Sequence, residues 1–313
     1  MHPGSGAHAG YSGRVLDPSL LYSVEREVAQ KVLGTEPALV HLFDGYIDAG
    51  TVTHGLSSYL LAECEHEVLA EFDLDQLHDY RSRRPQMVFD TNHWTEMVEY
   101  TLQLHRVLDA DGRTFLLLTG PEPDTQWQRT ASAVLELADW FGVSRLVTCS
   151  GIPMAVPHTR PTLVTAHATE PELATGNPMW IDRVQLPGSF SHMLEYRAGK
   201  AGILAQGFVA HVPHYLAQAS FPQATSAVLE RLSAATGIRV PMEPLRESSR
   251  ANLATIEAET EGDSDFPAML HALEEQYDRL AASGAASVPS ADEIGAAVER
   301  FLAEQDPPPD FGR

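Results

Sequence analysis

Residues 115–149 read FLLLTGPEPDTQWQRTASAVLELADWFGVSRLVTC and contain a complete strand, helix and strand. FLLLT is an unbroken apolar run, which is typical of a strand that lies in a parallel sheet and is covered on both faces. RLVTC, residues 145–149, predicts the second strand. Because a parallel crossover through a helix is almost always right-handed, this stretch predicts an α/β fold.

The helix between these strands has recognisable ends. Thr125 and Gln128 have the spacing of a capping box, Asp124 is a further candidate cap, and Gly142 predicts the end of the helix. The apolar positions recur at steps of four and three: Trp127, Ala131, Val134, Ala138 and Phe141. This face is expected to pack on the sheet, with Arg129 pointing elsewhere.

Other segments extend this unit. Strands are predicted at 38–43, 68–72, 98–104, 163–166 and 207–212, and helices at 49–61 and 189–197. The 98–104 segment alternates between apolar and polar residues, and a turn at 109–112 joins it to FLLLT as a hairpin. We predict four regions: a flexible tail at 1–18, an α/β domain at 19–222, a helical module at 223–304 and a flexible tail at 305–313.

Candidate ligand or partner loops follow the strands, because open parallel sheets bind ligands at the carboxyl ends of their strands. Two such corners carry paired acids, and the turn predicted at 150–153 follows RLVTC. The candidate residues are Asp44, Gly45, Asp48, Gly120, Glu122, Asp124, Ser150, Gly151 and His214. Converging acids would suit a divalent cation or an amine. Helix capping and turn formation are the competing and stronger interpretation of Asp44 and Asp124.

No catalytic set, cofactor motif or metal site is predicted. Ser150 lacks the flanking glycines of a nucleophile elbow, and the sequence has neither a phosphate-binding P-loop nor a GxGxxG dinucleotide motif. His211 and His214 have metal-like spacing, but no further ligand completes a tetrahedral set. Cys149 lies in an apolar strand, where a thiol usually packs.

Composition narrows the class of protein. The 313 residues carry a formal net charge of −22, which argues against binding to nucleic acid phosphates. No apolar stretch approaches the ~20 residues that a membrane helix needs. Two cysteines and the absence of a signal-peptide layout favour a cytoplasmic protein. Trp94, Trp127 and Trp180 are candidate contact anchors, although Trp127 fits the core better.

Five ordered segments resemble bacterial members of the proteasome assembly chaperone family, of the second-subunit type. They are LFDGYIDAG (42–50), LLLTGPEPDTQW (116–127), VTCSGIPMAVPHTRP (147–161), SFSHMLEYR (189–197) and HVPHYLAQ (211–218). The resemblance implies a three-layer α/β/α sandwich similar to phosphorylases and hydrolases, with a helical C-terminal appendage. Relatives dock on proteasome α-subunits through a C-terminal tyrosine motif, whereas this chain ends in DFGR, residues 310–313.

Two functions follow from these observations. The first is a non-enzymatic scaffold or chaperone that self-associates, with a trimer among the expected forms, and whose other partners include proteasome subunits. The alternative is a small-molecule enzyme or sensor of hydrolase or phosphorylase type, which would use the acidic loops at the sheet edge, with His214 as a base.

Overall fold

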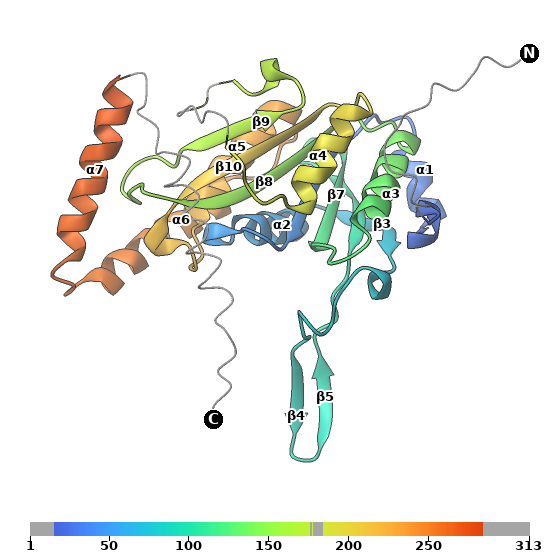
Figure 1. The fold of residues 1–313 in the computed structure, drawn as a ribbon, viewed down its shortest axis with the longest axis horizontal. Helices are drawn as coiled ribbons and strands as arrows, with labels where there is room; N and C mark the ends of the chain where they lie inside the picture. The colour runs from blue at the N-terminus through green and yellow to red at the C-terminus, as the bar shows by residue number, and fades with distance from the viewer. Residues whose placement is uncertain (1–15, 176, 178–183, 284–313) are drawn as a thin grey trace, which may run out of the picture.

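The computed structural model describes residues 16–175, 177 and 184–283, which form an α/β sandwich around one large mixed sheet (Figure 1). The eight strands lie in the order β1-β3-β6-β7-β2-β8-β10-β9. The neighbours β7, β2, β8 and β10 are parallel, whereas β1, β3 and β6 on one side and β9 on the other pair antiparallel. The predicted sandwich is confirmed.

The strands of the main sheet are β1 (Tyr22–Val24), β2 (Ala38–Asp44), β3 (His66–Phe72), β6 (Gln103–Leu108), β7 (Thr114–Pro121), β8 (Arg145–Met154), β9 (Val164–Ala168) and β10 (Ala205–Pro213). A separate two-stranded hairpin consists of β4 (Met87–Asp90) and β5 (His93–Met97). The helices are α1 (Arg26–Val32), α2 (Val52–Glu63), α3 (Trp127–Trp140), α4 (Phe190–Lys200), α5 (Pro222–Thr236), α6 (Glu243–Thr260) and α7 (Phe266–Ser283). Short 3₁₀ turns include η1 (Pro18–Leu21), η2 (Ala49–Thr51) and η5 (His214–Leu216).

The sheet has a hydrophobic core on each face, because successive side chains of a strand point to opposite faces. Val40 and Leu42 of β2 pack with α2 and α5, whereas Leu39 and Phe43 pack with α3 and α4. α4 covers the second face over β2, β8 and β10. This helix therefore forms one wall of the region at the carboxyl ends of those strands.

The apolar face predicted for α3 is confirmed, but its predicted capping box is wrong. The helix begins at Trp127 with Gln126 as its N-cap, and no side chain caps it. Thr125 instead donates its hydroxyl to the carbonyl oxygen of Gln76 at 3.0 Å. Arg129 is buried, and its guanidinium contacts Asp17 and Gln76. The local pattern missed these contacts because their partners lie far away in the sequence.

Strand β8 is longer than predicted. Ser150–Pro153 continues the strand and pairs with Val209–Val212 of β10 in parallel register. The turn expected at 150–153 was wrong, because β10 supplies hydrogen-bonding partners along one edge of this segment, although it contains Gly and Pro. Similarly, the strand expected at 98–104 starts only at Gln103.

The hairpin β4–β5 was not predicted and projects from the sandwich as an arm (Figure 1). We call residues 87–97 the arm. Its side chains alternate weakly between apolar and polar, and β5 has one extra residue, Thr95, opposite the step from Val88 to Phe89, which breaks the period-two pattern of that strand.

The C-terminal helices are attached in different ways. α5 packs on β8 and β10 and shares their core, whereas α7 is tied to the segment after β8 by Arg160, which pairs with Glu274 and Asp278. A separate module at 223–304 therefore stays a prediction. Residues 1–15 of the predicted first tail, residues 284–304 of the predicted helical module and the predicted tail at 305–313 lie outside the described residues, as does Trp180.

Candidate functional site

The two acidic corners meet at one edge of the sheet. β2 and β7 are parallel neighbours, and their register places Asp44 opposite Pro121. The backbone N–H of Glu122 donates to the carbonyl oxygen of Asp44 at 2.8 Å. Gly45 lies against Glu122, since a Cβ on this glycine would come within 2.6 Å of the Glu122 side chain.

Asp44 and Asp48 face the first turn of α2. The Asp48 carboxylate accepts hydrogen bonds from the N–H groups of Thr53 at 2.6 Å and His54 at 3.1 Å. His54 also lies 3.5 Å from the carboxylate of Asp44. Burial raises the pKa of both aspartates above the usual value. These acids stabilise the start of α2, where unpaired N–H groups and the helix dipole favour negative charge.

Glu122 and Asp124 point to different partners. Glu122 accepts the N–H of Phe190, at the start of α4, at 2.5 Å, and burial raises the pKa of its carboxyl. Asp124 instead binds the N–H of Asp79 at 2.6 Å and the guanidinium of Arg83 at 2.8 Å. Asp124 therefore fixes the 79–83 segment, and only Glu122 reaches the cavity described below.

The glycines of the candidate loops serve packing. Gly120 has φ of +143°, and a Cβ there would lie 2.2 Å from the carbonyl oxygen of Thr101. A Cβ on Gly151 would lie 2.2 Å from the carbonyl oxygen of Ala49. Neither position accommodates a side chain, because the neighbouring atom is backbone. His214 begins η5 beyond the end of β10 and does not line the cavity.

A cavity of about 230 Å³ lies between α4 and the carboxyl-end half of the sheet. Its lining combines apolar, hydroxyl and imidazole side chains from β2, β8, β9, β10 and the start of α4. The lining residues are Phe43, Tyr46, Ile47, Thr53, Glu122, Thr148, Cys149, Ser150, Ile152, Thr165, His167, Leu186, Pro187, Ser189, Ser191, His192 and Val209. Among these described residues there is one carboxylate and neither Lys nor Arg.

The sheet register explains why polar groups meet here. Thr148 of β8 lies opposite Gly207 of β10, which lies opposite His167 of β9. The next row contains Ser150, Val209 and Thr165 in the same order. Residues two apart share a face, so both rows point to α4. None of the sequence motifs indicates that these side chains meet, because the side chains come from three different strands.

A histidine–glutamate pair stands beside the cavity. Nδ1 of His167 lies 2.8 Å from Oε2 and 3.0 Å from Oε1 of Glu195, on α4. Buried His41 of β2 interacts electrostatically with the same pair, and desolvation lowers its pKa to about 4. His167, His192 and Glu195 were not among the candidate residues predicted from the sequence. The spacing of His192 and Glu195 on one side of a helix was the available signal.

The described residues contain no group of three His, Cys, Asp or Glu side chains that could hold a metal ion. His211 lies on β10, and its Nε2 is 2.8 Å from the hydroxyl oxygen of Thr165. Cys149 is buried, and burial raises the pKa of its thiol far above the usual range. This thiol is therefore protonated at neutral pH and a poor nucleophile.

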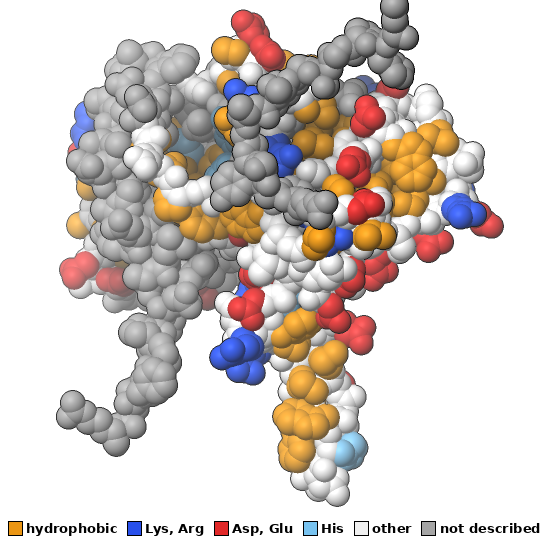
Figure 2. All heavy atoms as spheres, turned by 45° about the vertical axis from the view of Figure 1, so that its right-hand side comes forward, with side chains coloured by type: hydrophobic (Ala, Val, Ile, Leu, Met, Phe, Trp, Pro, Cys, Tyr) orange, Lys and Arg blue, Asp and Glu red, His pale blue; other side chains and the backbone are white. Residues whose placement is uncertain are grey.

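The arm presents a second candidate surface, which is apolar on one face. Met87 pairs with Met97 and Phe89 pairs with Trp94, and all four side chains lie on the same face. They are between 45% and 60% exposed. The rings of Phe89 and Trp94 pack edge to face with centroids 5.0 Å apart. Figure 2 shows hydrophobic side chains gathered along the arm.

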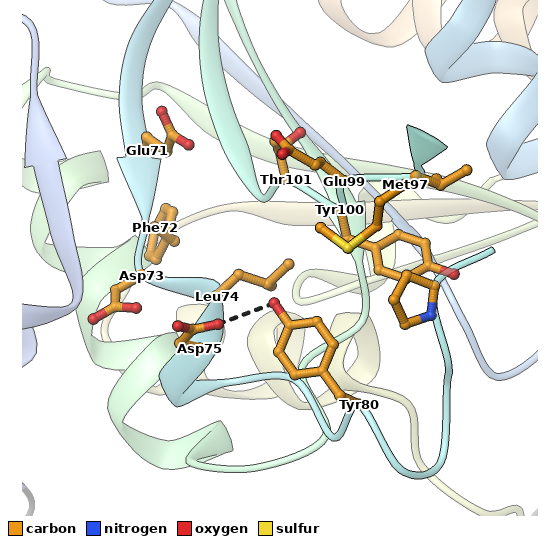
Figure 3. A pocket seen from close by; sticks show the side chains of 12 residues that line it. Glu71, Phe72, Asp73, Leu74, Asp75, Tyr80, Met97, Glu99, Tyr100 and Thr101 are labelled. Carbon is orange, nitrogen blue, oxygen red and sulfur yellow. Dashed lines mark hydrogen bonds between the residues drawn. The ribbon is translucent and has the colours of Figure 1, made fainter. Parts of the chain in front are cut away.

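An acidic cleft of about 340 Å³ lies at the root of the arm (Figure 3). Four carboxylates line it: Glu71, Asp73, Asp75 and Glu99. Tyr80 donates its hydroxyl to Asp75 at 3.0 Å, and Met97 connects the cleft to the apolar face of the arm. Exposed Arg81 and Arg84 are adjacent in sequence to lining residues, and neither guanidinium forms an ion pair within the described part of the chain.

Comparisons with known proteins place this architecture in a family. The PAC2 family profile matches residues 42–259. A Mycobacterium tuberculosis protein of unknown function, Rv2714, is 36% identical, with 96% of this chain and 99% of that chain covered and a TM-score of 0.82. A Corynebacterium glutamicum protein of unknown function is 35% identical, with 82% and 97% covered and a TM-score of 0.77.

A third structure shares the fold at lower identity. The proteasome-assembly chaperone homologue Rv2125 of M. tuberculosis is 24% identical, with 75% of this chain and 99% of that chain covered and a TM-score of 0.68. No curated protein matches the sequence. The family resemblance expected from the five sequence segments is confirmed. The profile covers more than two thirds of the residues, and the chain belongs to the PAC2 family.

Proposed function

We propose that this protein is a non-enzymatic, self-associating, chaperone-like protein that binds other proteins and acts in proteasome assembly. Membership of the PAC2 family and the fold shared with a proteasome-assembly chaperone homologue support a chaperone-like role. The described residues include no helix that could cross a membrane. Both cysteines are free, and the cytoplasm is the proposed location.

The apolar face of the arm is the observation that carries this proposal. An isolated two-stranded hairpin is at best marginally stable in water, and every residue of β4 and β5 is exposed. Covering the four half-exposed apolar side chains contributes on the order of 4–6 kcal/mol. This is at the lower end of the ~4–15 kcal/mol that association costs, so the interface must extend beyond the arm.

A second copy of the chain fits this requirement. The acidic cleft and the arginines Arg81 and Arg84 lie at the same root, which gives the surface complementary charges. The net charge of −22 opposes association of the rest of the molecule, so added salt is expected to favour it. The number of subunits, with a trimer among the expected forms, is a result of the test below.

The test measures molar mass by light scattering during size-exclusion chromatography. The unmodified protein is expected to be an oligomer, and a Phe89→Ser, Trp94→Ser double variant is expected to be a monomer. Trp140→Ser is the matched control, because Trp140 of α3 is exposed to a similar extent and lies outside the arm. A monomeric unmodified protein, or an oligomer that survives the double substitution, would contradict the proposal.

Proteasome subunits are the proposed partners of the assembled protein. Purified proteasome α-subunits are expected to be retained by the immobilised unmodified protein and less by the Phe89→Ser, Trp94→Ser variant. Equal retention by both proteins would separate proteasome binding from the arm, and no retention would remove proteasome assembly from the proposal.

The cavity under α4 favours a second candidate function, a small-molecule enzyme or sensor. It lies where open parallel sheets bind ligands, and Glu122 lines it. Thermal-shift measurements with nucleosides, nucleotides and divalent cations test this function. A melting temperature that no compound changes would remove its support.

A further inference from the structure

The cavity under α4 contains hydrogen-bonding groups that the protein itself leaves unused. The hydroxyls of Thr148, Ser150 and Ser191 have no hydrogen-bond partner among the described residues. The Tyr46 hydroxyl oxygen is inaccessible to solvent and also has no partner within the described chain. Buried polar groups are normally hydrogen-bonded, so the unpartnered hydroxyls of Tyr46 and buried Thr148 indicate a ligand, and the half-buried hydroxyls of Ser150 and Ser191 add to the polar lining.

The two imidazoles of the lining have opposite hydrogen-bonding roles. The carboxylate of Glu195 accepts from Nδ1–H of His167, and in the tautomer that keeps only this proton Nε2 is an acceptor. In His192, Nδ1 accepts the backbone N–H of Ser189 at 3.3 Å, so its Nε2 carries the proton and is a donor. The ring centroids are 6.0 Å apart. The two rings therefore offer one acceptor and one donor to the same cavity.

The charge of the described lining residues disfavours anionic ligands. Neither Lys nor Arg is among the described lining residues, and Glu122 contributes a carboxylate. Desolvation lowers the pKa of His192, which disfavours the charged form of this ring. A phosphate or carboxylate would therefore lose its hydration without gaining a cation, which is unfavourable.

We propose that the cavity binds an uncharged heterocyclic or amide-bearing small molecule. Its ring faces pack between apolar side chains such as Phe43 and Val209, and its donor and acceptor edge pairs with His167, His192 and the free hydroxyls. The volume of about 230 Å³ lies below the usual range for drug-sized ligands and limits the compound to about nucleoside size. This proposal names the ligand class for the second candidate function and does not depend on self-association.

The test uses pairs of compounds that differ in charge: adenosine and AMP, nicotinamide and nicotinate, and benzamide and benzoate. Binding to the full-length protein is measured by isothermal titration calorimetry and ligand-detected NMR. At least one uncharged compound is expected to bind, and its anionic counterpart is expected to bind at least tenfold more weakly. Absence of binding by all three uncharged compounds, or equal binding by the anions, would overturn the proposal.

Variants locate the binding site. Ser150→Ala is expected to weaken binding about fivefold, the typical effect of one lost hydrogen bond. Ser58→Ala is the matched control, because Ser58 is exposed on α2, and it is expected to have no effect. Val209→Trp is the second variant, and it should abolish binding because the indole fills the cavity. If the Val209→Trp protein does not fold, Thr148→Val is used as the second variant. Unchanged affinity in Ser150→Ala and in the second variant would overturn the assignment.

The same samples separate this proposal from self-association. The Phe89→Ser, Trp94→Ser variant is expected to bind the uncharged compound with unchanged affinity, because the arm does not line the cavity. Loss of the oligomer with retained binding supports two independent functions. Loss of ligand binding in the arm variant would overturn the claim that the cavity of a single chain is a complete site.

Discussion

The imidazole of His167 lies directly over the α-carbon of Gly207, its cross-strand neighbour. A Cβ at position 207 would lie 2.1 Å from Cε1 and 2.2 Å from Nε2 of His167. The ring can therefore reach Glu195 on α4 only because residue 207 has no side chain. Glycine weakens a strand interior, and here it permits the close approach of the His167 side chain.

Gly207→Ala is expected to displace the imidazole and destabilise the protein by about 1–3 kcal/mol. The free energy of unfolding in urea measures this cost. In a His167→Ala background the same substitution should cost much less, because the clashing ring is absent. Equal costs in both backgrounds would show that the contact between the ring and residue 207 is not the cause.

Buried histidines predict acid sensitivity. Desolvation lowers the pKa of His41, His105 and His211 to about 4, whereas these groups titrate near 6.5 in the unfolded chain. The unfolded state therefore binds more protons between pH 4 and 6.5, and stability falls as the pH is lowered through this range. Over this pH range each histidine lowers the free energy of unfolding by at most about 3 kcal/mol.

His211→Gln tests this pH dependence. Glutamine keeps a polar group near Thr165 and does not titrate, so the loss of stability between pH 6.5 and 4 should become smaller. Asp44, Asp48 and Glu122 have the opposite effect on stability. Burial raises their pKa, so the stability that they contribute at low pH is lost as the pH rises through the raised value. An unchanged pH profile of the unfolding free energy in His211→Gln would contradict the prediction.

We expect the sandwich to remain folded when the arm is removed. The N–H of Val98 donates to the carbonyl oxygen of Gln86 at 2.9 Å, so a short Gly-Ser-Gly linker can replace residues 87–97. The unfolding free energy at low protein concentration should change by less than about 1 kcal/mol, because the arm residues are exposed. Circular dichroism during urea titration measures it. If the α/β sandwich without the arm no longer folds, the prediction is wrong and the arm stabilises a single chain.

Asp124→Asn separates structural from ligand-binding acids. The variant loses its ion pair with Arg83 and should be destabilised by about 1–2 kcal/mol, with the N–H of Asp79 still bonded to the amide oxygen. Affinity for the cavity ligand should not change, because Asp124 does not line the cavity. Calorimetry and urea unfolding of the same preparation measure both quantities. Weaker ligand binding would place Asp124 in the site.

Part of the candidate site followed from sequence order and part did not. Parallel strands bring their carboxyl ends to one edge, so Asp44 and Glu122 could be expected to meet from two apolar runs alone. The role of each carboxylate could not be predicted from the sequence, because it depends on which amide or guanidinium lies nearest to it. Asp48 faces α2, Glu122 faces α4 and Asp124 faces Arg83.

The sequence by itself determined the strand, helix and strand at 115–149 and hence the α/β class, because unbroken apolar runs and a 3.6-residue period are local properties of a chain. Only the tertiary structure decided that 150–153 stays in β8, that residues 87–97 leave the body as an arm and that His167, His192 and Thr148 share a cavity. These features depend on pairing across strands and on burial against distant helices. Local patterns along the chain carry no record of either.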